Sequence, residues 1–464
     1  MPLRRILIAN RGEIALRIVR AARTLGIESV VAASVADRDS MAAREADRTV
    51  VIGPAQARAS YLDARLIVHA AEGTGCDGLH PGYGFLSERA SLAELCEQEG
   101  IVFVGPTAAS IRAVGDKLAA RHLAQNAGVP MAPGSGKLTS VQDAVTFADR
   151  IGYPVVTKAS AGGGGRGMVV ARDGKALAAG FERASIEAEE AFGDGSLFVE
   201  RFVERARHVE VQVMGDGKGR VLHFGERDCS LQRRYQKMIE EAPAVALPPK
   251  SRTRLHQAAI DLLATVNYRN AGTVEFLYDV DRDELYFMEV NARIQVEHPV
   301  SEMVTGVDLI ELQLRIAGTD ALPIAQNDVR VDGHAIEARI IAEDPDRGFT
   351  PSPGRIAEWK VPTGSGIRLD TAVAAGTVVP PFYDSMIAKL IVHAADRPAA
   401  VALLREALAE FEVTGVATNL AFLRAVAAHP DFTEGRFDTR WLETTFLPSY
   451  GQRKEAAHGA HRVS

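Results

Sequence analysis

Cysteine is scarce in this sequence, and its scarcity limits the classes of protein that the chain can encode. The 464 residues include only Cys76, Cys96 and Cys229, and no two of them form a Cys-x-x-Cys pair. A disulfide framework or a zinc ribbon needs more cysteines at closer spacing. We therefore expect a protein of a reducing compartment, with a cytoplasmic location.

An excess of positive charge and long apolar runs are also lacking. Lys and Arg number 53 against 60 Asp and Glu, which gives a formal net charge of −7. A general nucleic-acid binder carries a basic surplus, and a membrane span needs an apolar run of roughly 20 residues. The first residues lead directly into a short apolar run at 6–9, without a signal-peptide pattern. We expect no nucleic-acid partner, no membrane partner and no cleaved leader.

The composition that is present, 47% hydrophobic and 24% charged, is that of an ordinary globular protein with room for several structural units. The first third alternates apolar runs with amphipathic helical patterns. Strands are predicted at 6–9, 29–34, 49–52 and 101–104, and helices near 12–25, 63–73 and 87–100. This alternation is typical of an open, mostly parallel α/β sheet that ends near residue 114. Ligands of such sheets bind at the carboxyl ends of strands, which singles out the loops at 10–13 and 80–85.

Beyond residue 115 the pattern becomes mainly antiparallel. A helix is predicted at 117–127, followed by strand pairs at 155–159 and 168–171, 208–214 and 220–225, and 273–279 and 284–290. After residue 331 we expect a strand at 334–342 and a helix at 399–411. The resulting domain boundaries are 1–114, 115–328 and 329–446, followed by a flexible tail at 447–464.

The most informative segment is the hairpin that leads to residue 297. With its turn centred on Arg282, Glu275 and Glu289 are cross-strand partners, whose Cβ atoms should lie about 4.5–5.5 Å apart. Two carboxylates at that separation repel, so a cation must offset their charge. Because an extended chain has a period of two, one face should carry five polar side chains. These are Glu289, Asn291, Arg293, Gln295 and Glu297.

The residue types in this row indicate a metal and anion site. Carboxylates and an amide at Glu275, Glu289 and Asn291 suit Mg²⁺ or Mn²⁺ bound together with phosphates. Arg293 offers a planar fork for a small planar anion, and Glu297 is a candidate general base. The plainer alternative is an edge hairpin with a charged, solvated face. That alternative does not explain opposed glutamates followed by uncharged Asn and Gln in strict alternation, so we favour the binding site.

A run of glycines at 162–165 follows Lys158 and joins two predicted strands. Glycines let backbone N–H groups approach phosphate oxygens, but the run is no P-loop, because neither Gly-Lys-Ser/Thr nor a helix follows. A flexible hairpin tip is the alternative. Lys158 and Lys117 favour a lid over a triphosphate. Lys237 is a further candidate cation, although for an isolated basic cluster at 233–237 a solvated face is the favoured interpretation.

Six motifs in sequence order resemble biotin carboxylase. They are IANRGEIALR at 8–17, HPGYGFLSE at 80–88, KASAGGGGRGM at 158–168, ERDCSLQRRYQKMIEEAP at 226–243, EVNARIQVEHP at 289–299 and PPFYDSM at 380–386. The resemblance covers the chain from near residue 4 to near residue 446. It implies an α/β (α+β overall) ATP-grasp fold: a Rossmann-like N-terminal domain at 1–114, an ATP-grasp domain at 115–328 with a mobile lid at about 131–204, and a C-terminal biotin carboxylase domain at 329–446. The implied reaction is ATP-dependent carboxylation of biotin by bicarbonate through carboxyphosphate.

The resemblance also implies a role for each matched residue. ATP would be held by Lys117, Lys158, Gly163, Gly164, Gly165, Met168, Glu200, His208 and Gln232, and two Mg²⁺ or Mn²⁺ ions by Glu275, Glu289 and Asn291. Bicarbonate would bind Arg293, Gln295 and the Val296 backbone, and Glu297 would deprotonate it. Lys237 would stabilise the γ-phosphate, Arg339 the enolate-like biotin, and Tyr83 and Glu88 would lie near the biotin approach. For Arg339 a salt bridge to Glu337 is the plainer alternative.

Four positions depart from the family pattern. Tyr235 stands where His is frequent, Ala292 replaces a common Thr, Ile341 replaces a frequent Asn, and Ala161 removes one loop glycine. None of these changes removes a proposed metal ligand or acid–base group. We expect activity, with altered nucleotide affinity or carrier preference.

No Ala-Met-Lys-Met biotinylation site occurs, and no carboxyltransferase-length extension follows residue 446. We expect a discrete subunit that acts on biotin of a separate carrier protein, with a carboxyltransferase partner and a homodimeric state in which Arg17 and Asp384 take part. Acetyl-CoA, for fatty acid synthesis, is the expected acceptor, and other acyl-CoA or non-CoA acceptors stay open. Two further alternatives are a different ATP-grasp ligase and a catalytically silent nucleotide-binding subunit.

Overall fold

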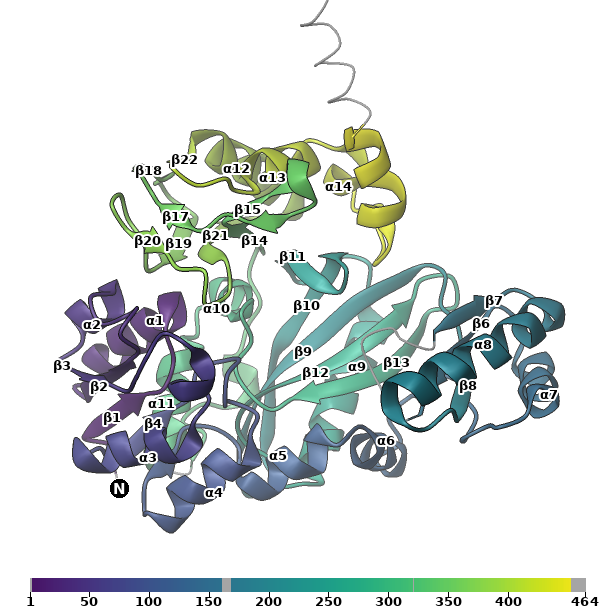
Figure 1. Cartoon of the computed structure of the whole chain (residues 1–464), viewed down its shortest axis with the longest axis horizontal. Coiled ribbons are helices and arrows are strands. Elements are labelled where there is room, and N and C mark those ends of the chain that lie inside the picture. Colours follow the sequence, from purple (N-terminus) through teal and green to yellow (C-terminus); the bar gives the residue numbers. More distant parts are fainter. Residues whose placement is uncertain (1, 161–167, 320, 452–464) are drawn as a thin grey trace, which may run out of the picture.

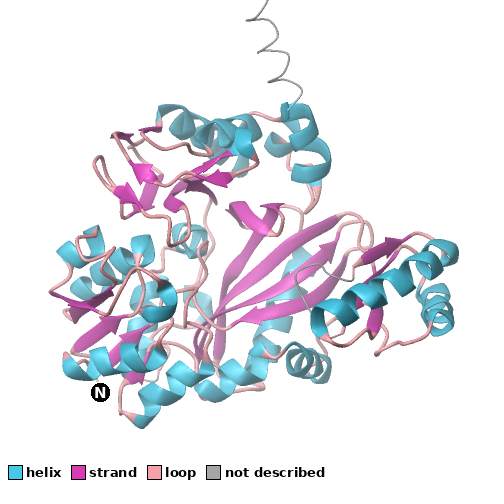
Figure 2. Cartoon of the chain, viewed as in Figure 1, coloured by secondary structure: helices cyan, strands magenta, loops and turns pink. Residues whose placement is uncertain are grey.

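The computed structural model describes residues 2–160, 168–319 and 321–451. A long antiparallel sheet occupies the middle of the molecule, with an α/β unit at the N-terminal end, a small sheet-and-helix unit on the opposite side, and a C-terminal unit above (Figure 1). The helices lie mostly toward the outside of these units (Figure 2).

The N-terminal unit is built on a five-stranded parallel sheet with the order β3-β2-β1-β4-β5, as the alternation predicts. Its strands are β1 (Arg5–Ile8), β2 (Glu28–Ala33), β3 (Arg48–Val51), β4 (Gly78–His80) and β5 (Val102–Phe103). Its helices are α1 (Gly12–Thr24), α2 (Met41–Glu45), η1 (Ala57–Ala59), α3 (Ala64–Gly73), α4 (Ala90–Gln98) and α5 (Ala108–Gly115). Ile6, Leu7 and Ile8 are fully buried, because a parallel sheet covered by helices excludes water from both faces. The helix expected from residue 87 begins at Ala90.

The central sheet has eight antiparallel strands in the order β13-β12-β9-β10-β11-β14-β21-β19. They are β9 (Ala206–Asp216), β10 (Val221–Arg233), β11 (Gln236–Ala242), β12 (Arg269–Asp279), β13 (Glu284–Asn291), β14 (His334–Ile341), β19 (Ile367–Thr371) and β21 (Met386–Ala394). Helices α6 (Lys117–Asn126), α9 (Pro249–Ala264), α10 (His298–Thr305), α11 (Leu309–Thr319) and η2 (Gln326–Asp328) accompany them. Since β11 pairs with β14, strands from both sides of the expected boundary at residue 328 join one sheet.

The small unit beside the central sheet has its own hydrophobic core. Its three strands are β6 (Val155–Ala159), β7 (Val169–Ala171) and β8 (Leu197–Arg201), and α7 (Val141–Ile151) and α8 (Gly174–Phe192) pack on them. Leu177, Phe181 and Leu197 are buried between these layers. The strand expected from residue 168 begins at Val169, and the glycine run at 162–165 lies outside the described residues.

The C-terminal unit packs helices against the β14–β21 end of the central sheet. Short strands precede and separate them: β15 (Glu343–Asp344), β16 (Thr350–Pro351), β17 (Gly354–Arg355), β18 (Glu358–Lys360), β20 (Val378–Val379) and β22 (Glu412–Thr414). The helices are η3 (Pro345–Arg347), α12 (Arg397–Glu410), α13 (Leu420–Ala427), α14 (Pro430–Thr433) and η4 (Leu442–Phe446).

Residues 447–451, the first part of the tail predicted at 447–464, continue as helix after η4. Aromatic contacts explain why this turn stays helical, since Tyr450 lies against Phe422 and Phe446 in the core of the C-terminal unit. Within the described ranges, no helix combines the length and the apolar composition that crossing a membrane requires.

Candidate active site

A cavity of about 950 Å³ lies where the N-terminal, central and C-terminal units meet. It brings together residues that are far apart in the sequence, including eleven of the predicted site residues. These are Tyr83, His208, Gln232, Lys237, Glu275, Glu289, Arg293, Gln295, Val296, Glu297 and Arg339. A concave site of this size that combines apolar walls with converging charges is typical of a small-molecule site.

The opposition of Glu275 and Glu289 is confirmed by the β12–β13 register, in which the two residues are direct partners. A bulge follows immediately, because Phe276 pairs with Phe287. The expected offsetting cation is also present. Nζ of Lys237 lies 3.1 Å from Oε1 of Glu275, and Nδ2 of Asn291 donates to the same oxygen at 2.9 Å.

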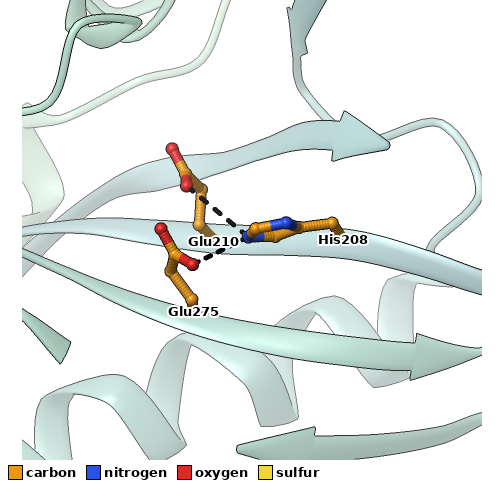
Figure 3. Close-up of side chains that lie close together, drawn as sticks. All are labelled: His208, Glu210 and Glu275. Carbon is orange, nitrogen blue, oxygen red and sulfur yellow. Dashed lines mark ion pairs between the residues drawn. The ribbon is translucent and has the colours of Figure 1, made fainter. Parts of the chain in front are cut away.

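His208 is a second partner of Glu275. Its Nε2 lies 3.0 Å from Oε2 of Glu275 and 4.0 Å from Oε2 of Glu210, and Figure 3 shows the imidazole pointing between the two carboxylates. Burial alone would lower the pKa of His208, but Glu275 and Glu210 together outweigh it, and the net shift is upward. The pKa of Glu275 is held well below its usual range, because Lys237 and His208 offset the burial that would raise it.

Lys237 links this cluster to Glu297. Its Nζ lies 2.7 Å from Oε1 of Glu297 and 2.5 Å from Oε2 of Glu210, so one ammonium contacts three carboxylates. Burial alone would raise the pKa of Glu297, but Lys237, Arg339 and Arg227 hold it well below its usual value. Glu297 is therefore ionised, as proton abstraction requires.

Arg339 lies between Glu297 and Glu240. Nη2 of Arg339 donates to Oε2 of Glu297 at 2.9 Å, and Nε donates to Oε1 of Glu240 at 2.6 Å. Glu337, the partner in the plainer alternative, is buried on the same strand and affects Arg339 only through its charge. Burial raises the pKa of Glu240 to about 7, whereas the pKa of Glu297 is low. The two carboxyl groups that share Arg339 therefore differ in proton affinity.

The prediction that residues 289–297 form one extended strand with polar side chains on one face is wrong beyond Asn291. Strand β13 ends there, and residues 292–297 form an irregular segment that leads into α10. Arg293 nevertheless contacts two of the other predicted residues. Its guanidinium donates to Oε1 of Gln295 at 2.8 Å and to Oδ1 of Asn291 at 3.2 Å. Glu297 reaches the site as the residue that precedes α10 and not as a strand residue.

The remaining predicted residues lie on or near the small unit. Nζ of Lys158 lies 2.6 Å from Oε2 of Glu200, and Arg121 pairs with the other oxygen of Glu200 at 2.9 Å. Met168 precedes β7 and is 37% exposed. Lys117 begins α6, but its side chain lies outside the described part of the structure, as do Gly163, Gly164 and Gly165.

Comparisons with known proteins agree with this arrangement along the whole chain. Models of the biotin carboxylase N-terminal domain, the carbamoyl-phosphate synthase L chain ATP binding domain and the biotin carboxylase C-terminal domain match residues 2–111, 116–325 and 337–444. Biotin carboxylase 1 of Bacillus subtilis is 48% identical over 95% of this chain and 98% of its own length. The chain belongs to the biotin carboxylase family. It is therefore an ATP-grasp enzyme of the ligase class.

Two further relatives in this family belong to carboxylases with different names. The mitochondrial methylcrotonoyl-CoA carboxylase subunit alpha of Arabidopsis thaliana is 47% identical over 95% of this chain, which spans 60% of that protein. The biotin carboxylase domain of a thermophilic 2-oxoglutarate carboxylase, solved with bicarbonate, has a TM-score of 0.91 and 43% identity, covering 96% of this chain and 98% of that one.

Several residues of this biotin carboxylase site were missed by sequence reasoning. Glu210 and Arg227 are fully buried, with Nε of Arg227 lying 2.6 Å from Oε1 of Glu210. Arg227 also donates to Gln212 at 2.8 Å and to Ser301 at 3.0 Å. The signal was available in β9, where His208, Glu210 and Gln212 alternate with valines in a strand that is buried up to its last residue. Polar residues at every second position of a buried strand indicate a shared polar network.

The departures from the biotin carboxylase pattern occupy different environments. Tyr235 is 75% exposed at the β10–β11 turn, with a positive φ of 67°. Ala292 is buried, and its N–H donates to Glu88 at 3.0 Å. Ile341 lines the cavity, where its N–H donates to Oδ1 of Asn419 at 2.9 Å.

Proposed function

We propose that this chain carboxylates biotin on a separate carrier protein, with ATP and bicarbonate as the other substrates. The observation that supports this reaction most directly is the convergence of Glu297, Lys237, Arg339 and Arg293 on one cavity. An ionised carboxylate, two cations for phosphate and enolate charge, and a planar fork for bicarbonate are what the chemistry needs.

The order of events follows from the weak electrophilicity of bicarbonate. Glu297 takes the bicarbonate proton, and a bicarbonate oxygen then attacks the γ-phosphorus of ATP, breaking its bond to ADP and forming carboxyphosphate. Lys237 stabilises the charge on the transferred phosphate. Carboxyphosphate breaks down to CO₂ and phosphate, and the released phosphate takes the N1′ proton of biotin. The deprotonated N1′ then adds to CO₂ while Arg339 stabilises the ureido oxygen.

The chemistry of the donor set fits divalent ions. Glu275, Glu289 and Asn291 offer two carboxylates and an amide oxygen on adjacent strands, which suits Mg²⁺ or Mn²⁺. Bound ions neutralise phosphate charge and orient the triphosphate. We further propose that the nucleotide is held by Lys117, Lys158, Met168, Glu200, His208, Gln232 and the 163–165 glycines. The unit at about 131–204 then closes over the nucleotide and excludes water.

The decisive test measures phosphate release by the purified protein with ATP, Mg²⁺, bicarbonate and free biotin. We expect release to depend on both bicarbonate and biotin. A Glu297→Gln variant should lose about 10²–10⁴-fold in kcat, the range typical of a general base. Glu410→Gln, at the exposed end of α12, is the control and should retain full activity. Unchanged turnover in Glu297→Gln, or ATP cleavage that ignores bicarbonate and follows an added amine, would contradict the proposal.

We propose acetyl-CoA as the final acceptor, with a biotin carboxyl carrier protein, a carboxyltransferase subunit and a homodimeric state completing the assembly. The Bacillus subtilis relative, which the match covers over 98% of its length, carries the name biotin carboxylase 1, and that name supports a carrier-bound biotin as the immediate acceptor. Other relatives carry the names of methylcrotonoyl-CoA and 2-oxoglutarate carboxylases, so the acceptor needs a direct test. Isolation of the endogenous biotinylated carrier with its transferase, followed by assay with a panel of acyl-CoA and oxo-acid acceptors, identifies it. Preference for an acceptor other than acetyl-CoA would correct the acceptor assignment and leave the proposed carboxylation of biotin unaffected.

A further inference from the structure

Lys389 is a fully buried ammonium at the junction of three structural units. It belongs to β21, and its side chain is 0% exposed. Its Nζ donates to the carbonyl oxygen of Val296 at 2.8 Å and lies 3.1 Å from Oε1 of Glu13 in α1. Asp370 of β19 lies 3.9 Å away. Of these contacts, the one with Val296 reaches segment 292–297, which carries the predicted bicarbonate residues.

The sheet register pairs Lys389 with Arg339. The two residues are direct partners in the antiparallel β14–β21 ladder, so their side chains leave the sheet on the same face. Arg339 donates to the Glu297 carboxylate at 2.9 Å, while Lys389 donates to the Val296 carbonyl at 2.8 Å. Two neighbouring cations therefore hold two successive residues of the 292–297 segment.

This segment needs such support, because it lies outside the strand ladder. Strand β13 ends at Asn291 and α10 begins at His298, so regular backbone pairing does not position residues 292–297. At the end of the segment, His298 Nδ1 lies 2.8 Å from the Gln295 carbonyl oxygen. Lys389 supplies the next anchor, at Val296.

The surroundings of Lys389 keep it charged. Burial alone would lower its pKa, but the carboxyl groups of Glu13, Glu337 and Asp370 outweigh burial and raise it. Tyr83 donates a short hydrogen bond to the same Glu13 oxygen that pairs with Lys389. Arg368, His298 and the cross-strand neighbour Arg339 are further titratable groups nearby, and Arg368 pairs with Asp370 at 2.8 Å. The ammonium is thus surrounded by acidic groups from three other elements, α1, β14 and β19.

We propose that Lys389 is a positioning residue for bicarbonate, acting through the Val296 peptide. The inference rests on the proposed function, since it assigns bicarbonate to Arg293, Gln295 and Val296. Lys389 is fully buried behind the cavity wall and does not touch the substrate itself. Its hydrogen bond fixes the peptide that joins Val296 to Glu297, and so fixes the bicarbonate-binding backbone relative to the base.

The test replaces Lys389 by Met, which keeps much of the volume and removes the donor. We expect the KM for bicarbonate to rise by about 10–100-fold, the usual effect of losing a residue that orients a site, while the KM for ATP stays within about twofold. Arg397→Met is the matched control. Arg397 is another buried cation of the C-terminal unit, paired with Glu241 at 2.7 Å, and its loss should lower stability without changing the bicarbonate KM.

Bicarbonate binding is also measured without turnover, as the thermal shift that bicarbonate causes in the presence of MgADP. The wild-type protein should show the shift and Lys389→Met should show it only at about 10–100-fold higher bicarbonate. If Lys389→Met folds poorly, the Glu13→Gln/Lys389→Met double variant removes the unpaired charge and serves in its place. Lys389→Arg, which retains charge and donors, should recover part of the affinity.

An unchanged bicarbonate affinity in folded Lys389→Met, or equal losses for bicarbonate and ATP, would overturn the inference. An equal rise in the bicarbonate KM of Arg397→Met would do the same, because it would reveal a general effect of destabilisation. Failure of the proposed function is distinguishable: the wild-type protein itself would then show neither bicarbonate-dependent turnover nor a bicarbonate-dependent thermal shift.

Discussion

Nζ of Lys237 lies 2.7 Å from Oε1 of Glu297, so the residue proposed to hold the transferred phosphate is paired with the proposed base. The same ammonium contacts Glu210 and Glu275. Phosphate oxygens that approach Lys237 would compete with the Glu297 carboxylate for it. Loss of that partner raises the proton affinity of Glu297, which favours proton abstraction at the moment when both substrates are bound.

Removing Lys237 should destabilise the protein in a pH-dependent way. Lys237→Met leaves three buried carboxylates short of a cation, and we expect the free energy of unfolding at pH 7 to fall by about 3–5 kcal/mol. In the wild-type protein the pKa values of Glu275 and Glu297 are lowered, so their stabilising contribution is present above their unfolded pKa of 4.5 and is lost as the pH falls. The difference in unfolding free energy between variant and wild type should therefore narrow only as the pH falls below 4.5. Urea unfolding of both proteins at a series of pH values from 7 downward measures this difference in free energy.

The control is Lys360→Met, which breaks an exposed pair with Glu412 on the surface of the C-terminal unit. Its effect should stay below about 1 kcal/mol at every pH. A Lys237→Met variant as stable as Lys360→Met would show that the carboxylates do not depend on this ammonium.

Glu289→Gln should weaken the response to divalent ions. The change removes one charge from the pair that Glu289 forms with Glu275 across the hairpin. We expect the Mg²⁺ concentration for half-maximal ATP cleavage to rise by about 10-fold or more, with a parallel change for Mn²⁺. Glu284→Gln, on the same strand but near the hairpin turn, is the matched control. Equal Mg²⁺ dependence in both variants would remove Glu289 from the metal site.

Arg207 should contribute far more to stability than its neighbour Arg205. Nε of Arg207 lies 2.9 Å from Oδ2 of Asp228, both side chains are buried, and the guanidinium covers the Phe437 ring at 3.9 Å. Arg207→Met leaves Asp228 without its cation and should cost about 3–5 kcal/mol in urea unfolding. Arg205→Met breaks only an exposed pair with Asp281 and should cost less than about 1 kcal/mol. Similar losses would show that burial does not decide the strength of these pairs.

His80 should make the protein less stable as the pH falls below 6.5. Its side chain is fully buried, Nδ1 accepts a hydrogen bond from the Gly82 N–H at 3.0 Å, and burial lowers its pKa to about 3. The unfolded chain then binds a proton that the folded chain does not, so stability falls between pH 6.5 and about pH 3. His80→Asn keeps an acceptor near Gly82 and should reduce the loss of stability between pH 7 and 5.5 by about 1 kcal/mol. His69→Asn, on an exposed face of α3, is the control; an unaltered pH slope in His80→Asn would refute the prediction.

Local patterns in the sequence determined a good part of the fold. The strand–helix alternation led to the parallel N-terminal sheet, and the turn near Arg282 led to the Glu275–Glu289 register, because both depend on residues close together in the chain. The resemblance to the biotin carboxylase family extended the fold prediction from these elements to the whole architecture. The same local reasoning failed beyond Asn291, since a period of two holds only while the chain remains a strand.

Only the tertiary structure decided which charges meet. Glu240 and Lys389 lie on different strands of one sheet, and each is paired with a residue that is distant in the sequence, Arg339 and Glu13 respectively. Long-range strand order and the packing of α1 against that sheet set these pairs, and no short-range periodicity encodes them. The sequence by itself thus determined the elements and the chemical types at the site, whereas three-dimensional packing determined which cation neutralises which carboxylate.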